Sequence, residues 1–354
     1  MFRNIAIAGL AVTAVMVATP SPAQDALKLA IPMRGNWETA APDLGARAGI
    51  FKKHGITFES VYTQGAGETL QVVISGSADI GIGVGTSAAM AAYVKGAPVR
   101  VIGNSTTGTN DLYWYVRTES PIKSLKDATE GTTIAYSTNG SSSHNFALAI
   151  LRLYNSKAKA TSTGAMPATL TQVMTGQIDI GFAVPPIGFQ QLEDGRIRII
   201  ARASEVPGSQ DQTVRTTIAH AARLAKDPEL MARFIRGYAD TIDWMYSSDP
   251  KVLEIYEDFS KIPPRFTQKA RTDFYSKDML DPYRISGLDA AMAEAVAGKF
   301  LPAPLTKEQL ADLFRVPQRS KCEAGRGNVR RSSPAVTYRV EVTSPTPRTP
   351  SAAG

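Results

Sequence analysis

The sequence contains few of the residues that build disulfides and metal centres. Of its 354 residues one is cysteine, Cys322, and three are histidine: His54, His144 and His220. A single cysteine cannot close a disulfide within the chain. No histidine lies two to five residues from another, so the spacing of a zinc site is absent. We therefore expect neither a metal nor a cofactor, and no thiol chemistry in the body of the protein.

The motifs of common enzymes are missing as well. The sequence has no Gly-x-Ser-x-Gly nucleophile elbow and no Walker phosphate loop. Gly81-Ile82-Gly83 is by itself weak evidence for a bound nucleotide. These absences favour a protein that binds a ligand over an enzyme that transforms one.

The net charge of +7 belongs mainly to the ends of the chain. Residues 317–354 carry seven basic and two acidic side chains, and the start of the chain carries Arg3. The body, residues 24–316, therefore has a net charge of only +1, and nucleic acid is not expected as a partner. Residues 317–354 also hold five prolines and no periodic pattern, which predicts a disordered basic tail.

The first 23 residues have the pattern of a secretory leader. A basic start precedes an apolar run from Ile5 to Val17, and small residues follow at Ser21 and Ala23. This predicts a signal peptide, residues 1–23, that is cleaved after Ala23. A membrane anchor is the alternative, but the run is shorter than the roughly 20 residues that a span requires.

One pattern occurs twice, at residues 69–84 and 169–184, with an offset of 100 and no gap. In each copy apolar residues first recur at intervals of three and four, which predicts one face of a helix. A glycine then marks a helix end, and a short apolar run predicts a buried strand. The repeat thus predicts two similar α/β lobes with a ligand between them. The identical positions are Thr69/Thr169, Leu70/Leu170, Val73/Val173, Gly76/Gly176, Asp79/Asp179, Ile80/Ile180, Gly81/Gly181 and Val84/Val184.

Around the repeat, predicted strands alternate with predicted helices, which indicates a mostly parallel, doubly wound sheet in each lobe. Ser120-Pro121 marks a break, and from Asp227-Pro228 onward the pattern is helical. We predict that the second lobe is inserted into the first and that two crossings, near 116–120 and 204–213, form a two-strand hinge. The predicted lobes are residues 24–116 with 214–316, and residues 117–213.

Five segments, in order along the chain, carry a family resemblance: Ala48-Gly49-Ile50-Phe51-Lys52-Lys53-His54-Gly55-Ile56, Gly76-Ser77-Ala78-Asp79-Ile80-Gly81, Lys95-Gly96-Ala97-Pro98-Val99, Ser120-Pro121-Ile122-Lys123-Ser124-Leu125-Lys126-Asp127 and Thr133-Ile134-Ala135. With them, residues 27–316 resemble the nitrate/sulfonate/taurine-type substrate-binding proteins of ABC transporters, which share their fold with thiamine-pyrimidine-precursor binding proteins. One departure is Ala128-Thr129-Glu130-Gly131, where such proteins usually read Leu-x-Gly-Lys. The resemblance implies a periplasmic-binding-protein type II-like fold, closure on a small ligand by hinge motion, and a membrane permease as partner.

Ligands of open parallel sheets bind beyond the carboxyl ends of the strands, and four loops qualify. In the first, Trp37 is expected to lie over a flat or apolar ligand or else to pack at the lobe edge. The second loop, residues 83–87, and the third, residues 137–143, are rich in hydroxyls that can cap a helix or bind a ligand oxygen. The fourth, 183–186, has two prolines and offers apolar contact. The predicted contact residues are Trp37, Gly85, Thr86, Ser87, Thr107, Thr138, Asn139, Ser141, Ser142, Ser143 and Pro185.

Several charged residues have two interpretations. Asp79 and Asp179 occupy equivalent places before the strands, so turn and cap roles are favoured over a catalytic pair. Asp111 would suit an amine on the ligand but also fits a turn. Arg34 and, more remotely, Arg215 are the candidates for holding an anion, because the four loops contain no arginine.

The sequence thus predicts a periplasmic, monomeric solute receptor of an ABC importer and no enzyme. The expected ligand is a small polar or anionic organic solute of the sulfonate or taurine, nitrate, pyrimidine or aromatic carboxylate class. Two alternatives remain open. One is an exported sensor or adaptor that signals to a membrane kinase, and the other is an enzyme of the thiamine-precursor branch that consumes its own histidine.

Overall fold

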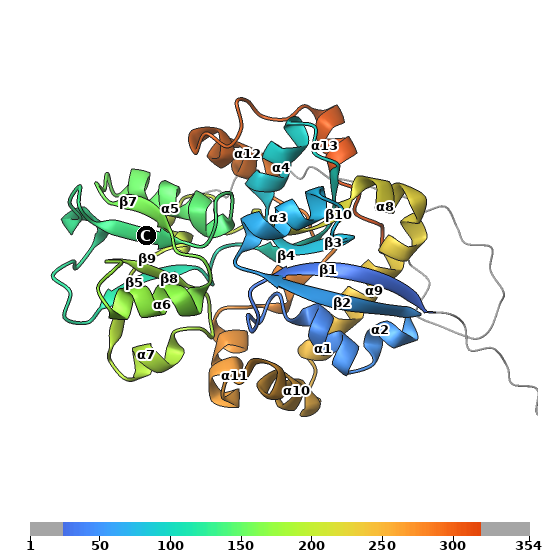
Figure 1. Ribbon diagram of the computed structural model, residues 1–354, viewed down its shortest axis with the longest axis horizontal. Coiled ribbons are helices and arrows are strands. Elements are labelled where there is room, and N and C mark those ends of the chain that lie inside the picture. The colour runs from blue at the N-terminus through green and yellow to red at the C-terminus, as the bar shows by residue number, and fades with distance from the viewer. Residues whose placement is uncertain (1–23, 320–354) are drawn as a thin grey trace, which may run out of the picture.

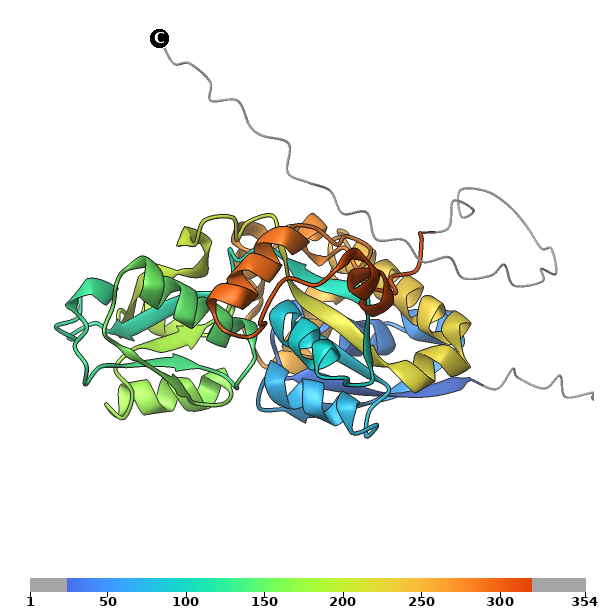
Figure 2. The ribbon, with the colours of Figure 1, turned by 90° about the horizontal axis from the view of Figure 1, so that it is seen from above.

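The computed structural model describes residues 24–319, which form two α/β lobes that lie side by side (Figures 1 and 2). The predicted leader and residues 320–354 of the predicted tail lie outside the described residues. The predicted start of the tail at residue 317 is wrong, because Pro317 is buried and Arg319 pairs with Asp281 at 2.7 Å. Regular packing therefore continues through Arg319.

The first lobe is built on a five-stranded sheet in the order β2-β1-β3-β10-β4. All strands that touch β1 are parallel to it, whereas β10 runs antiparallel to β3 and β4. Every residue of β3 is buried, which explains its run of isoleucine, valine and glycine. The strands are β1 (Asp25–Pro32), β2 (Ile56–Thr63), β3 (Ile80–Gly85), β4 (Val99–Thr107) and β10 (Thr213–His220).

Helices cover both faces of this sheet, and the C-terminal helices belong to the same lobe (Figure 1). The long helix α9 begins as the sequence predicts, because the Asp227 carboxylate accepts from Leu230 N at 2.9 Å and Pro228 opens the first turn. The helices are α1 (Ala41–Arg47), α2 (Ile50–Lys53), α3 (Ala66–Ile74), α4 (Thr86–Val94), α8 (Ala221–Lys226), α9 (Pro228–Met245), α10 (Lys251–Ser260), α11 (Pro264–Asp273), α12 (Leu288–Ala297) and α13 (Lys307–Leu313), with a 3-10 turn at Lys277–Leu280.

The second lobe repeats the same sheet order with shorter strands. Strands β8-β5-β9 form one group and β6-β7 another. Ala135 N donates to Ile180 O at 2.7 Å and joins the groups, which gives the order β7-β6-β8-β5-β9. The elements are β5 (Tyr113–Arg117), β6 (Thr133–Tyr136), β7 (Lys159–Ser162), β8 (Gly181–Ala183), β9 (Ile197–Arg202), α5 (Ser142–Leu153), α6 (Met166–Met174) and α7 (Phe189–Glu193), with 3-10 turns at Leu125–Asp127 and Ala203–Glu205.

The first predicted crossing, near 116–120, is wrong. Strand β5, which the sequence places at the end of the first lobe, instead pairs with β8 and β9 of the second. The chain therefore crosses within 108–112, beside a return segment at 206–212. Gly108 N donates to Gln212 O at 2.9 Å, and the Thr109 and Ser209 hydroxyls lie 2.8 Å apart. Each lobe thus receives its antiparallel strand directly after a crossing.

The repeated sequence forms equivalent structure in both lobes, α3–β3 and α6–β8. The Thr69 hydroxyl lies 2.7 Å from that of Thr63, and the Thr169 hydroxyl lies 2.6 Å from that of Thr163. Gly76 and Gly176 have φ values of +74° and +76°, so a side chain at either position would strain the turn. The repeat is therefore a structural framework.

The paired aspartates hold the strand that precedes them in each sheet. The Asp79 carboxylate accepts from Lys28 N at 2.8 Å, at the start of the first sheet. The Asp179 carboxylate accepts from Thr133 N at 2.8 Å and from the Thr133 hydroxyl at 2.9 Å. Both carboxylates bind backbone of β1 or β6, as turn and cap residues do, and lie away from the cleft.

We expect Asp179→Ala to lower the free energy of unfolding by about 1–2 kcal/mol, because Thr133 N loses its acceptor. Urea unfolding would measure the loss. Asp278→Ala, which removes an exposed carboxylate, is the control and should change stability by less than about 0.5 kcal/mol. Equal effects of the two substitutions would show that the Asp179 carboxylate does not hold β6.

Candidate ligand-binding site

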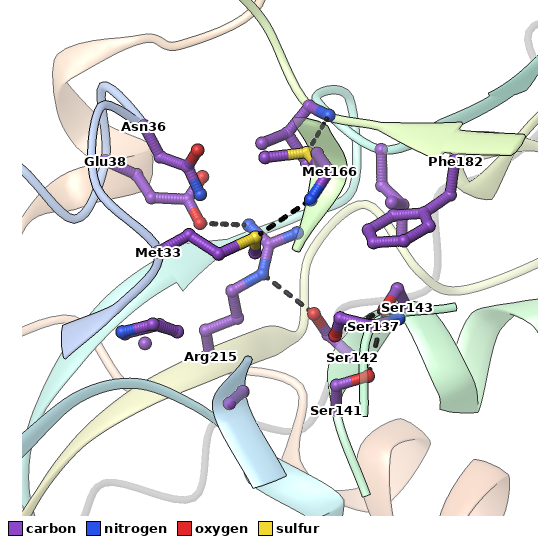
Figure 3. A pocket seen from close by; sticks show the side chains of 15 residues that line it. Met33, Asn36, Glu38, Ser137, Ser141, Ser142, Ser143, Met166, Phe182 and Arg215 are labelled. Carbon is purple, nitrogen blue, oxygen red and sulfur yellow. Dashed lines mark hydrogen bonds and ion pairs between the residues drawn. The ribbon is translucent and has the colours of Figure 1, made fainter. Parts of the chain in front are cut away.

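A cavity lies between the lobes and takes its walls from both of them (Figure 3). Its non-atom space is about 370 Å³, part of which is open solvent. The loops after β1, β6 and β8 contribute, with Gly83 near the end of β3, so the cavity lies at the carboxyl ends of the strands. We call it the interlobe cavity. Its lining residues are Pro32, Met33, Asn36, Glu38, Ala66, Gly83 and Arg215 from the first lobe and Leu112, Ser137, Ser141, Ser142, Ser143, Met166, Phe182 and Val184 from the second.

One side of the interlobe cavity is apolar and rich in sulfur. Figure 3 shows Met33 and Met166 across from each other, with Phe182 beside them. Met166 N donates weakly to Met33 Sδ at 3.4 Å, and Val184 N donates to Met166 Sδ at 3.1 Å. Thioethers adapt to ligands of irregular shape, so this side offers contact without fixed polarity.

The opposite side carries serine hydroxyls that already bind one another. Ser143 Oγ accepts from Ser137 N at 3.0 Å and lies 2.9 Å from Ser141 Oγ. Ser141 Oγ in turn accepts from His144 N at 3.1 Å and caps helix α5. Capping and mutual bonding therefore engage much of the hydroxyl capacity that the sequence assigned to a ligand.

A buried ion cluster forms the floor of the interlobe cavity. Arg215 Nη1 lies 3.0 Å from Glu38 Oε1 and 2.6 Å from Asp111 Oδ2. Arg215 Nε donates to Ser142 Oγ at 2.8 Å and so links β10 to the second lobe. The three charged side chains are at most 6% exposed. At this depth charges persist only when they are paired and hydrogen-bonded.

Burial changes the protonation of this cluster. Desolvation raises the pKa of Glu38 to about 8, partly offset by the charge of Arg215 and reinforced by that of Asp111. Burial alone would lower the pKa of Arg215, but the two carboxylates raise it, so the guanidinium stays charged. Burial and the same carboxylates raise the pKa of Tyr275 well above its ordinary value. The phenol stays neutral and donates to Pro185 O at 3.1 Å.

The second predicted loop lines a different space. Gly85, Thr86 and Ser87 face a smaller cavity with about 260 Å³ of non-atom space, which they share with Gln212 and Thr213. The Thr86 hydroxyl donates to Thr213 O at 2.8 Å and so binds the start of β10. Of this loop only Gly83 lines the interlobe cavity.

Other predicted contact residues have structural partners. Trp37 is fully buried, 5.1 Å from the ring of Tyr256, and its Nε1 donates to Tyr246 Oη at 3.3 Å. It packs in the core of the first lobe and does not line the interlobe cavity. The fourth loop reaches the cavity through Val184, whereas the carbonyl of Pro185 binds Tyr275.

The remaining predicted residues bind protein atoms. Thr107 donates to Asn104 Oδ1 at 3.3 Å, Thr138 Oγ1 accepts from Gly67 N at 2.9 Å, and Asn139 Oδ1 accepts from Tyr136 Oη at 2.7 Å. Ser141, Ser142 and Ser143 are the predicted contact residues that do line the interlobe cavity.

Sequence reasoning missed the cluster as a unit. The sequence patterns point to Asp111 and to Arg215 separately, and no pattern points to Glu38. Arg34, the other anion candidate, lies over the rings of Tyr62 and Phe259 and does not line the cavity. Two charged residues in loops and one in a strand carry no spacing signal, so only the fold brings them together.

A two-lobe α/β structure with a cavity between the lobes defines the class of periplasmic-binding-protein folds. A family model described as NMT1/THI5-like matches residues 43–251, more than half of the chain. The protein therefore belongs to the NMT1/THI5-like family. No curated protein matches the chain.

Solved structures confirm the fold class. The alkanesulfonate-binding protein SsuA from Xanthomonas axonopodis pv. citri, bound to MOPS, has a TM-score of 0.69 at 16% identity, over 84% of this chain and 99% of that one. The periplasmic nitrate-binding protein NrtA from Synechocystis PCC 6803 has a TM-score of 0.64 at 12% identity, over 82% and 85%. The desulfurization enzyme DSZB has a TM-score of 0.58 at 14% identity, over 81% and 96%. The fold thus serves binding proteins and an enzyme alike.

Within residues 24–319, no helix is both long and apolar enough to cross a membrane. In the same range no three His, Cys, Asp or Glu side chains come together as a metal site.

The raised pKa of Glu38 predicts a stability change with pH. The ordinary pKa of a glutamate is 4.5, so the folded state favours the protonated form of Glu38. The resulting stabilisation of the folded state is fully present below about pH 4.5 and is lost as the pH rises toward 8. We expect the free energy of unfolding of the unaltered protein to fall between pH 5 and 8 relative to Glu38→Gln, by on the order of 1 kcal/mol or more.

Urea unfolding across this pH range would measure the difference. Glu59→Gln, which changes an exposed glutamate on β2, is the control and should follow the unaltered protein. Parallel pH profiles for Glu38→Gln and the unaltered protein would contradict a raised pKa at Glu38.

Proposed function

We propose that this protein is the periplasmic solute-binding receptor of an ABC importer, and that it binds a small polar organic solute in the interlobe cavity. The observation that carries the proposal is the cavity itself, which neither lobe could form alone. A site divided in this way couples binding to the relative position of the lobes. A permease on the membrane could then distinguish the loaded receptor from the empty one by its shape.

The lobes touch through backbone as well as side chains. Gly65 and Gly67 at the start of α3 and Gly85 at the end of β3 face the loop 137–142 of the second lobe. A Cβ atom at Gly67 would lie 2.1 Å from Asn139 O, and one at Gly85 would lie 2.9 Å from Gly140 O. Approaches this close require glycine, so the sequence accommodates a closed arrangement.

Side-chain contacts between the lobes surround the interlobe cavity. Arg265 pairs with Glu193 at 2.9 Å on one side, and Arg152 pairs with Glu294 on another. Arg215 reaches Ser142 between them. Exposed ion pairs contribute little stability each, typically below about 1 kcal/mol, so a closure built on them can reverse.

The positions of the histidines support binding over chemistry. His54 Nε2 lies 2.7 Å from Asp240, where α2 meets α9, and His220 ends β10. His144 stacks on Tyr136 with ring centroids 4.1 Å apart, and burial lowers the pKa of His144. None of the three lines the interlobe cavity, so an enzyme that consumes its own histidine lacks one at this site.

The predicted leader supports a periplasmic location, and the nearly neutral body argues against nucleic acid as a partner. Native mass spectrometry of protein purified from the periplasm would identify the solute, and uptake of that solute by a deletion strain would test the receptor role. Import that is unchanged in the deletion strain would overturn the proposal. If the deletion strain takes up the solute normally but no longer responds to it transcriptionally, the sensor is favoured.

Closure can be tested at Gly67, where the opposing atom is a backbone oxygen that cannot rotate away. We expect Gly67→Ala to weaken binding of the copurified solute at least tenfold, equivalent to about 1.4 kcal/mol, because the lobes cannot close fully. The folded state should not suffer, since alanine favours helix α3 more than glycine does. Calorimetric titration and solution scattering would measure affinity and compaction.

The matched control is Gly131→Ala, because a Cβ atom there meets only Thr129 Oγ1 at 3.9 Å. This variant should bind and compact like the unaltered protein. Normal affinity and normal compaction in Gly67→Ala would show that ligand binding does not need the closed contact.

A further inference from the structure

Counted together with Asp111 directly behind it, the interlobe cavity has more acidic than basic side chains. Among the described residues that line it, Arg215 is the one basic side chain and Glu38 the one acidic side chain. Asp111, directly behind, shares the same guanidinium nitrogen. Two carboxylates therefore face one positive charge in a place that water hardly reaches. Such an excess is costly unless a proton or a second cation compensates for it.

Acceptor oxygens at this end of the cavity are without donors. Glu38 Oε2, Asn36 Oδ1 and Asp111 Oδ1 are buried and have no hydrogen-bond partner. Glu38 and Asn36 line the cavity, and Figure 3 shows their side chains next to each other on the loop after β1. Both residues are only 3% exposed. Because unpaired buried acceptors cost free energy, a ligand that donates hydrogen bonds here is favoured.

Two of the three guanidinium nitrogens of Arg215 are already engaged with protein atoms at this end of the cavity. Arg215 Nη1 is already shared by Glu38 and Asp111, and its Nε is bound to Ser142. The hydroxyls of Ser141 and Ser143 are engaged with each other. A sulfonate or carboxylate would also face Asn36 Oδ1, an acceptor that needs a donor, so this end of the cavity favours a hydrogen-bond donor over the anionic solutes expected from the sequence.

The far side of the cavity suits an apolar body. Met166 and Phe182 lie there, and Phe182 offers a ring to an aromatic or cationic group. Donors are needed at one end and apolar contact at the other, so a compatible ligand is amphiphilic, with its N–H groups at the Glu38 end.

On this basis, and resting on the proposed receptor function, we propose that the ligand is an organic cation. Its protonated amine or amidine group donates to Glu38 Oε2 and Asn36 Oδ1, and its apolar body lies against Met166 and Phe182. Glu38 is then the residue that selects cations, and Arg215 holds Glu38 and Asp111 in place.

Binding of such a cation should displace a proton from the cluster. Burial raises the pKa of Glu38 to about 8, so the empty site carries this proton at neutral pH, and a nearby cation favours its release. The other ionisable groups that face Glu38 are Arg215, Asp111, Tyr238, Tyr256 and Tyr275. Burial raises the pKa values of the three tyrosines, so they remain neutral between pH 6 and 8.

The test compares three probes with the same ring and different charge: benzamidinium, benzamide and benzoate. Calorimetric titration of the full chain in phosphate and in Tris buffer at pH 7 would give affinities and proton exchange. We expect benzamidinium to bind at least tenfold more tightly than the other two probes and to release up to one proton. Its affinity should rise from pH 6 to 8 as Glu38 ionises more readily.

Two variants probe the role of Glu38 in opposite directions. Glu38→Gln should weaken the binding of benzamidinium at least tenfold and abolish proton release. It should leave the affinity for benzamide unchanged. Asn36→Asp adds a second negative acceptor, so it should raise the affinity for benzamidinium and lower the affinity for benzoate. This variant keeps the test decisive if Glu38→Gln does not fold. Glu59→Gln on the outer surface is the control and should match the unaltered protein.

Tightest binding of benzoate would overturn the cation assignment, as would equal losses for all three probes in Glu38→Gln. Absence of any thermal shift with benzamidinium at about 10 mM would overturn it as well. These results leave the receptor function standing, because that function depends on the copurified solute and on import by the deletion strain.

Discussion

Strand β10 is the constraint on which the cleft depends. It lies between β3 and β4 in the first sheet and enters directly from the second lobe, so its pairing completes one sheet and ends one hinge crossing. The same strand carries Arg215 to the floor of the interlobe cavity. Because β10 is hydrogen-bonded on both sides, the guanidinium is placed by backbone geometry, and Glu38, Asp111 and Ser142 converge on it from loops and a helix start.

The buried cluster gives the cavity its chemical character. A guanidinium between two carboxylates is costly to bury, and this composition leaves acceptors without donors where a ligand would lie. Replacing the cluster with apolar residues would remove that cost and also the charged floor of the cavity. The cavity thus has fixed charge on one side and adaptable thioethers on the other, an arrangement suited to an amphiphilic ligand.

The internal repeat shows how a common framework can support different walls. Thr69 and Thr169, Gly76 and Gly176, and Asp79 and Asp179 make equivalent contacts in the two lobes. The loops that follow the repeated strands differ. The first brings hydroxyls to a smaller neighbouring cavity, and the second brings Val184 to the interlobe cavity. The polar contribution comes instead from the serine loop and from the cluster around Arg215.

Local pattern by itself determined most of the elements here, because each depends on neighbours in sequence. The repeated helix, glycine turn and buried strand, the Asp227-Pro228 helix start and the paired turn aspartates follow from spacing and side-chain chemistry alone. Tertiary structure decided which sheet accepts β5, since the mostly buried pattern of Tyr113–Arg117 predicts a strand without specifying its neighbours. It also decided the site. Glu38, Asp111 and Arg215 are far apart in sequence, and only the hinge and the central place of β10 bring their charges within hydrogen-bonding distance.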